Sequence, residues 1–207
     1  MKKAKDVHEF IEEQRGAVAS NPECGTSHYN LAVGLMGIKE YDEAEKELRD
    51  AVACSPTLAE AYVLLGGICL NKNDLDGCLH YNKQATSVRP GFSVGYGNIG
   101  FIQFQQGKID EAVESLEKAL KYNPMFIQAY TTLANAYLMK GQIDKSIELN
   151  LKAIDLDESF PIAHNNLVIA LVEKGDFKKA IEHADKSVTL GYEVSEEILN
   201  LLKKHRI

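Results

Sequence analysis

The chain has 207 residues, of which 45% are hydrophobic and 26% are charged, and its formal net charge is −7 at pH 7. This composition supports a full core, and the acidic balance argues against nucleic acid, whose binding needs Lys and Arg clustered on one face. No apolar stretch approaches the length of a membrane span, the first residues lack the apolar run of a signal peptide, and the four cysteines form no CxxC motif. We therefore expect no membrane insertion and a cytoplasmic location with reduced thiols.

Proline marks an internal repeat. Pro22, Pro56, Pro90 and Pro124 follow one another at a constant interval along the chain. The segment 127–158 shows the form of one unit, which is two amphipathic helical patterns joined by a glycine turn. A fixed period of about 34 residues is typical of a solenoid of stacked helix–turn–helix units, so we expect one continuous stack without an internal domain boundary.

The repeat can be read in columns when position 1 is set at Gly25, Ala59, Ser93, Ile127 and Pro161. Positions 8, 20 and 27 then carry mainly small residues, which predicts that helices approach closely there. Position 15 is the expected left-handed end of the first helix. It is Gly107, Gly141 and Gly175 in the last three units, Asn73 in the second and the less suitable Lys39 in the first.

These columns resemble the tetratricopeptide repeat (TPR) family. The resemblance implies an all-α fold, a right-handed α-solenoid of antiparallel helix pairs with about five repeats, at 25–58, 59–92, 93–126, 127–160 and 161–194. Residues 1–24 and 195–207 are expected to form N- and C-terminal capping helices, the first over residues 5–20 and the second with Ser195 as its N-cap. The chain departs from the family at position 4, often Trp in TPR proteins, which here is His28, Tyr62, Tyr96, Tyr130 and His164.

The resemblance also implies a concave groove lined by the first helix of each pair. Five asparagines fall at groove positions: Asn30, Asn98, Asn135, Asn165 and Asn166. An asparagine side chain offers a donor and an acceptor, so a ladder of them could hold an extended peptide backbone. The alternative is that these side chains cap or bridge neighbouring helices, or face water.

Apolar residues occupy many of the remaining groove positions. They are Val33, Met36, Val63, Leu64, Leu70, Phe101, Phe104, Leu138, Met139, Ile162, Ile169 and Val172. A contiguous exposed apolar patch indicates an interaction site. Phe101 and Phe104 are the expected anchors, and Leu138 is a further candidate contact. The alternative is that some of these side chains turn inward. Lys and Arg are missing from these groove positions, so we do not expect a clamp for a free carboxylate.

The sequence contains no catalytic constellation that we would support, and we expect a non-enzymatic protein without a metal or cofactor. His28 and His164 are interpreted as packing residues, and Cys69 and Cys78 as inert core thiols. The first hypothesis is a binding module for an extended, mostly apolar or neutral peptide of a protein partner. The alternative is a self-assembling scaffold whose N-terminal helix, with Val7, Phe10, Ile11 and Val18, packs into a neighbouring copy to form a homo-oligomer.

Overall fold

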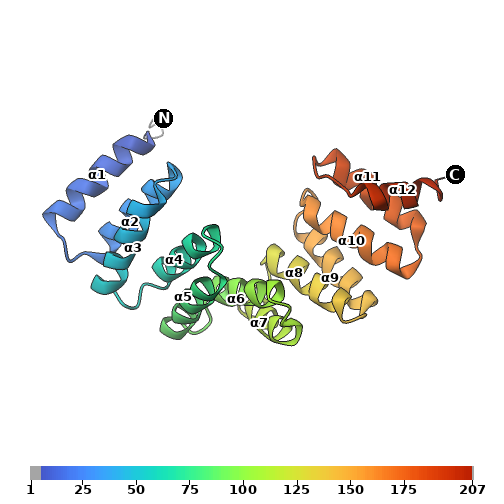
Figure 1. Cartoon of the computed structure of the whole chain (residues 1–207), viewed down its shortest axis with the longest axis horizontal. Helices are drawn as coiled ribbons and strands as arrows, with labels where there is room; N and C mark the ends of the chain where they lie inside the picture. The colour runs from blue at the N-terminus through green and yellow to red at the C-terminus, as the bar shows by residue number, and fades with distance from the viewer. Residues whose placement is uncertain (1–5, 207) are drawn as a thin grey trace. The chain divides into compact units, whose positions relative to one another are not determined.

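The computed structural model describes residues 6–206, which form twelve helices and no strand (Figure 1). The all-α prediction is confirmed. The helices are α1 (Val7–Ser20), α2 (Gly25–Gly37), α3 (Tyr41–Cys54), α4 (Ala59–Asn71), α5 (Leu75–Val88), α6 (Ser93–Gln105), α7 (Ile109–Tyr122), α8 (Ile127–Met139), α9 (Ile143–Leu156), α10 (Pro161–Lys174), α11 (Phe177–Thr189) and α12 (Glu196–Lys203). None of these described helices is both long and apolar enough to cross a membrane.

The chain divides into two compact units, Met1–Asn98 and Ile99–Ile207, with the division inside α6. The sequence predicted a single continuous stack. Because each repeat of a solenoid contacts only its neighbours, few contacts hold the two sides of any cut together, and a division of this kind is compatible with regular repeats. Each unit is therefore described by itself.

Small residues let the two helices of each pair approach closely. In the first unit α2 packs on α3, and Ala32, Ala44 and Ala51 are completely buried between larger side chains such as Leu48. In the second unit α8 packs on α9 and α10 on α11, with Ala134, Ala153 and Ala180 also completely buried. The predicted small-residue columns are thus confirmed, and their cause is steric: a longer side chain there would push the helices apart.

The turn between the two helices of a pair uses a left-handed residue in every repeat. Gly107, Gly141 and Gly175 have φ values of 74°, 70° and 81°, and Lys39 and Asn73 have 66° and 59°. The amide that follows bonds back to the carbonyl five residues earlier, as in Asp74 N to Cys69 O at 2.8 Å. This bond closes the helix end, so the conformation is kept even where the residue is lysine.

Both ends of the described chain carry an extra helix. Helix α1 packs on α2, where Gly34 leaves room for it: a Cβ at Gly34 would lie 2.8 Å from Ile11 Cγ1. Helix α12 begins at Ser195, whose Oγ accepts a bond from Ile198 N at 3.4 Å, and it buries Leu202 in the core of the second unit. The expected helices are confirmed with slightly shorter bounds; residues 1–5 and 207 lie outside the described residues.

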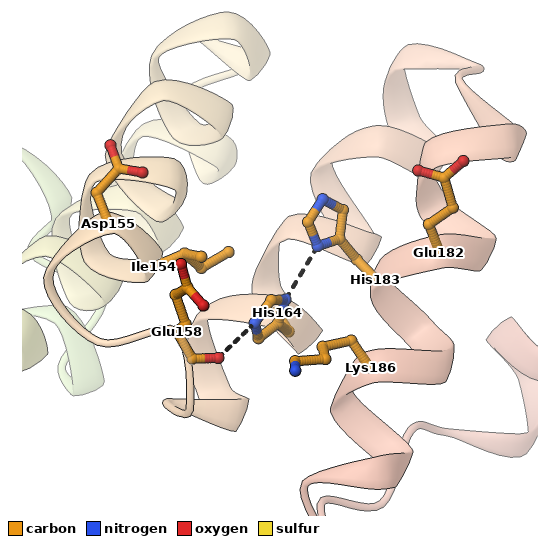
Figure 2. A pocket seen from close by; sticks show the side chains of 7 residues that line it. All are labelled: Ile154, Asp155, Glu158, His164, Glu182, His183 and Lys186. Atoms are coloured by element: carbon orange, nitrogen blue, oxygen red, sulfur yellow. Dashed lines mark hydrogen bonds between the residues drawn. The ribbon is translucent and has the colours of Figure 1, made fainter.

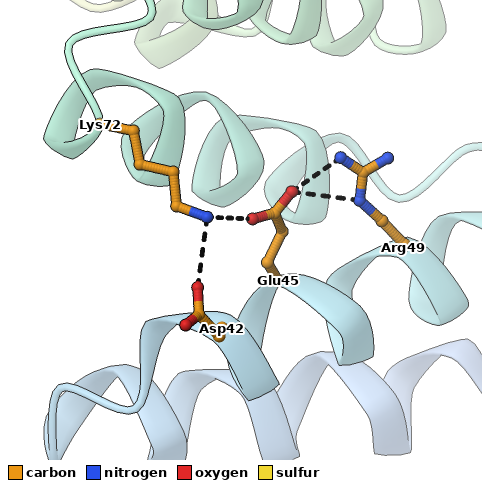
Figure 3. A network of polar contacts seen from close by, with 4 residues as sticks. All are labelled: Asp42, Glu45, Arg49 and Lys72. Carbon is orange, nitrogen blue, oxygen red and sulfur yellow. Dashed lines mark hydrogen bonds and ion pairs between the residues drawn. The ribbon is translucent and has the colours of Figure 1, made fainter.

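Exposed ion pairs join successive repeats. Lys72, at the end of α4, contacts Asp42 at 3.3 Å and Glu45 at 2.7 Å on α3, and Glu45 also binds Arg49 (Figure 3). The contact of Lys72 with Asp42 recurs at the same sequence separation in the second unit, as Lys140–Asp110 and Lys174–Asp144. Solvent screens exposed ion pairs of this kind, so these contacts add little to stability.

Candidate functional site

Asn98 bridges two repeats in the first unit. Its Nδ2 donates to Asn82 Oδ1 at 2.9 Å, and Asn82 Nδ2 donates to the Cys78 carbonyl at 2.8 Å. Asn82 is completely buried and Asn98 is half-buried. The Asn98 amide nitrogen is therefore bonded within the chain. This agrees with the alternative that these asparagines bridge neighbouring helices.

Asn150 and Asn166 occupy the same two repeat positions in the second unit. Asn150 Nδ2 donates to the Ser146 carbonyl at 3.0 Å, which repeats the bond made by Asn82. Asn166 is only 6% exposed. The Asn150 Oδ1 and Asn166 Nδ2 atoms are both buried and have no hydrogen-bond partner among the described residues. Because its side chain is buried, Asn166 belongs to the interior of the repeat stack.

The other three predicted asparagines differ from Asn98 and Asn166. Asn30, Asn135 and Asn165 are half-buried, and their amides form no side-chain hydrogen bond to another described residue. Asn135 lies four residues before Met139 on α8, and Asn165 lies four residues before Ile169 on α10. Residues four apart share one face of a helix, so each asparagine lies one turn from an apolar neighbour.

The apolar groove residues divide into exposed and inward-facing sets. Met139 is 67% exposed, and four others are 36–41% exposed: Val33, Leu70, Phe101 and Ile162. Met36, Leu64 and Val172 instead pack against the cores of their units, while Phe104 and Leu138 are half-buried. Some of these side chains are therefore exposed, and others turn inward as the alternative from the sequence states.

Several exposed and half-buried residues of the second unit surround one cavity of about 220 Å³. Its lining is Leu138, Met139, Gly141, Ile143, Ile169 and Glu173, from α8, α10, the turn after α8 and the first residue of α9. We call it the α8–α10 cavity. Of the predicted site residues, Leu138 lines it; Phe101 and Phe104 lie on α6, outside this lining. The wall is aliphatic and ends at the exposed carboxylate of Glu173.

A second cavity of the same unit, of about 270 Å³, contains two histidines (Figure 2). His164 on α10 and His183 on α11 face each other with their Nδ1 atoms 2.9 Å apart, and His164 Nε2 lies 3.2 Å from the Glu158 carbonyl oxygen. The rest of the lining is Ile154, Asp155, Glu158, Glu182 and Lys186. We call it the histidine cavity.

His28 makes the corresponding contacts in the first repeat. Its Nε2 lies 2.9 Å from the Pro22 carbonyl, six residues earlier, and its Nδ1 lies 2.6 Å from Glu47 Oε2. Both partners are acceptors, which favours a doubly protonated ring. Burial opposes this charge, but the Glu47 carboxylate and the Pro22 carbonyl outweigh burial and raise the pKa of His28. Asp50 lies nearby, with its ligand atoms and those of His28 and Glu47 within 4.8 Å of one another.

The comparisons with known proteins agree with the periodicity. Models described as "TPR repeat" and "Tetratricopeptide repeat" match residues 100–141, 15–59 and 127–160. The chain is a tetratricopeptide repeat protein. No curated protein matches this TPR chain.

Solved structures show the same fold. YrrB, described as a TPR protein with an unusual peptide-binding site, is 18% identical with a TM-score of 0.73, over 94% of this chain and 99% of its own. PilW, a type IV pilus biogenesis factor, is 22% identical with a TM-score of 0.78, over 95% and 91%. MamA from Desulfovibrio magneticus RS-1 is 24% identical with a TM-score of 0.69, over 81% and 94%.

The TPR frame explains which polar residues the sequence reading missed. His28 and His164 are buried at position 4, as a packing role requires, but both also bind the residue at position 23 of their own repeat. Position 23 was not considered at the sequence level. The signal was available, because Glu47 and His183 occupy this column opposite the two histidines that replace tyrosine.

The cysteines of this TPR protein behave as core or surface thiols. All four are free, and Cys78 is almost completely buried. Burial, with a smaller contribution from Cys69, raises the pKa of Cys78 to about 11. Since the thiolate is the reactive form, Cys78 is unreactive at neutral pH, in agreement with the sequence interpretation.

Proposed function

We propose that this protein is a non-catalytic binding module that holds an extended, mostly apolar or neutral peptide of a partner protein on the face formed by α8 and α10. The observation that carries the proposal is the α8–α10 cavity, whose aliphatic wall is open to solvent at Met139. Exposed apolar surface of this kind is costly in a protein without a partner, and it is typical of interaction sites. YrrB, with the same fold, is described as having a peptide-binding site.

Each side chain of this face has a distinct role in the proposal. Leu138, Met139 and Ile169 accept an apolar side chain of the peptide. Asn135 and Asn165 lie one helical turn away with uncommitted amides, and they bind the N–H and C=O groups of the peptide backbone. Asn166 supports α10 from within the repeat interface of the same unit. The contacts expected of Asn30 on α2 and of Phe101 and Phe104 on α6 stay predictions from the sequence, separate from this face, and Asn98 has its bridging role within the first unit.

Selection from a library of displayed random peptides tests the proposal. Selection on the wild-type chain should yield peptides that bind in solution, and Met139→Glu should reduce their affinity by at least tenfold. Asn135→Ala should weaken them about fivefold, which corresponds to about 1 kcal/mol for one backbone hydrogen bond. Leu151→Glu is the matched control, because Leu151 is an exposed leucine (42%) on α9 outside the cavity lining.

Chemical shifts identify where the selected peptides bind. Backbone amide signals of Leu138, Met139 and Ile169 should move on titration with peptide. Peptides that bind Met139→Glu as tightly as they bind the wild type, or that shift only signals of other helices, would contradict the proposal.

Self-assembly through the N-terminal helix remains a prediction from the sequence. In α1, Ile11 is 4% exposed and Val18 packs against the core of the first unit, while Val7 is 37% exposed. Most of the apolar surface named in that hypothesis is thus used within the chain, and the peptide-binding proposal is preferred. Light scattering of the full chain tests the alternative, for which a mass above that of one chain is required. The cytoplasmic location also remains a prediction.

A further inference from the structure

The two histidines of the histidine cavity are held in defined orientations. The Glu158 carbonyl oxygen can only accept a hydrogen bond, so His164 Nε2 carries the proton and donates it at 3.2 Å. In the neutral ring, His164 Nδ1 then has a free lone pair. It then accepts from an N–H at His183 Nδ1, 2.9 Å away, in the contact drawn as a dashed line in Figure 2. Two imidazole nitrogens therefore converge on a single shared proton.

The charged groups around the histidine cavity favour an added cation. The cavity lining includes three carboxylates, from Asp155, Glu158 and Glu182, and one ammonium group, from Lys186. Among these charged groups, negative charge exceeds positive charge.

We propose that His164 and His183 form a binding site for a divalent transition-metal ion of the Zn²⁺ type, with Nδ1 of each ring as a ligand. The ion takes the place of the shared proton, which leaves to solvent. Bonds of about 2.0–2.1 Å to zinc place two ligand nitrogens about 3.3 Å apart in tetrahedral geometry, so the observed 2.9 Å requires a displacement of a few tenths of an ångström. Water supplies the other ligands, and the cavity carboxylates balance the charge of the ion.

The contact with the Glu158 carbonyl supports this assignment. Metal-binding histidines generally donate their second ring N–H to a carbonyl or carboxylate, which fixes the tautomer and the ring orientation. Imidazole ligands suit Zn²⁺, Cu²⁺ and Ni²⁺ and are poor ligands for Mg²⁺ and Ca²⁺. The cluster of His28, Glu47 and Asp50 is different, because the His28 ring is closed between a carboxylate at 2.6 Å and a carbonyl at 2.9 Å and is favoured in its charged form.

The chain itself offers a substitution that removes the ligands with little risk to the fold. Repeat two has tyrosine at both corresponding positions, Tyr62 and Tyr81. The double variant His164→Tyr/His183→Tyr therefore copies a pair that the same fold already accepts. His80→Gln removes an exposed histidine outside the cavity and is the matched control.

Isothermal titration of tag-free protein with ZnCl₂ tests the site. We expect one zinc ion per wild-type chain and per His80→Gln chain, and at least tenfold weaker binding to the double tyrosine variant with unchanged circular dichroism. Histidine side-chain nitrogen spectra should show zinc at Nδ1 of both rings. The inference is overturned if the wild-type chain binds no zinc, or if the double tyrosine variant binds zinc with the same curve as the wild type. It is also overturned if Mg²⁺ gives the wild-type chain the same binding curve as zinc. If Glu47→Gln, rather than the tyrosine variant, abolishes binding, the site is also wrongly assigned.

Discussion

Replacing Asn98 with alanine tests whether this asparagine stabilises the repeat interface or is available to bind a partner. The substitution removes the 2.9 Å bond to Asn82 Oδ1, an oxygen of a completely buried side chain. Loss of one hydrogen bond costs about 1 kcal/mol, and an unsatisfied buried acceptor raises the cost to about 1–3 kcal/mol. We expect Asn98→Ala to lower the free energy of unfolding by about 2 kcal/mol.

Asn135→Ala is the matched control. Both asparagines lie within the first helix of a repeat and are half-buried, so both substitutions gain the same helix propensity. Asn135 makes no side-chain hydrogen bond to another described residue, and its replacement should change stability by no more than about 0.5 kcal/mol. Urea unfolding followed by circular dichroism measures both values. Equal costs for the two variants would refute the bridging role of Asn98.

Changing both members of the bridge separates the hydrogen bond from the space it occupies. In the preceding repeat the same two positions hold Leu48 and Leu64, and Leu64 packs against the core cluster that contains Leu48. The double variant Asn82→Leu/Asn98→Leu copies this apolar pair and leaves no buried polar atom unsatisfied. We expect it to be more stable than Asn98→Ala, because replacing both partners by apolar groups can be nearly neutral.

Two further predictions concern the histidine clamp of the first repeat and the left-handed turns. Because the folded-state pKa of His28 is raised, its contribution to stability is fully present below the unfolded pKa of about 6.5 and is lost as pH rises through the folded pKa. His28→Tyr should therefore cost more at pH 5.5 than at pH 8.5 in urea unfolding, and equal costs would contradict the ion pair with Glu47. Lys39→Gly should raise the free energy of unfolding by about 0.5–1 kcal/mol in thermal melts, because the φ of Lys39 is 66°. Asn73→Gly should raise it less, since asparagine tolerates the left-handed conformation. Equal gains for the two variants would show that backbone strain at Lys39 is not the cause.

The fold could be predicted because the repeated small residues show where the helices pack closely. The small residues of positions 8, 20 and 27 recur with the period of the repeat, and a single column of this kind constrains where two helices touch. The left-handed turn also occurs at Lys39, the residue type that is less suitable at position 15, so the geometry of the repeat outweighs local preference there. The Lys72–Asp42 type of ion pair was missed, since it joins side chains of two different repeats.

The candidate site could be predicted only in part, because the sequence assigns a side chain to a face but does not give its partner. Asn98 and Asn135 have the same chemistry and fall on the same kind of helix. What separates them is the residue opposite: Asn98 meets the amide of Asn82, while nothing comparable engages Asn135 among the described residues. Position 24 holds asparagine only at Asn82 and Asn150, and each of them precedes a repeat with asparagine at position 6, Asn98 and Asn166.

This pairing decides where a partner should be sought. A peptide can exchange hydrogen bonds only with amides that the chain has not already used, and breaking the Asn82–Asn98 bridge to bind would leave a buried acceptor unsatisfied. The amides left for the proposed polar ladder are those of Asn30, Asn135 and Asn165. Asn135 and Asn165 lie one turn from residues that wall the α8–α10 cavity. The same two helices thus offer uncommitted amides beside exposed apolar surface, a combination that favours an extended chain with a single apolar anchor over a flat protein surface.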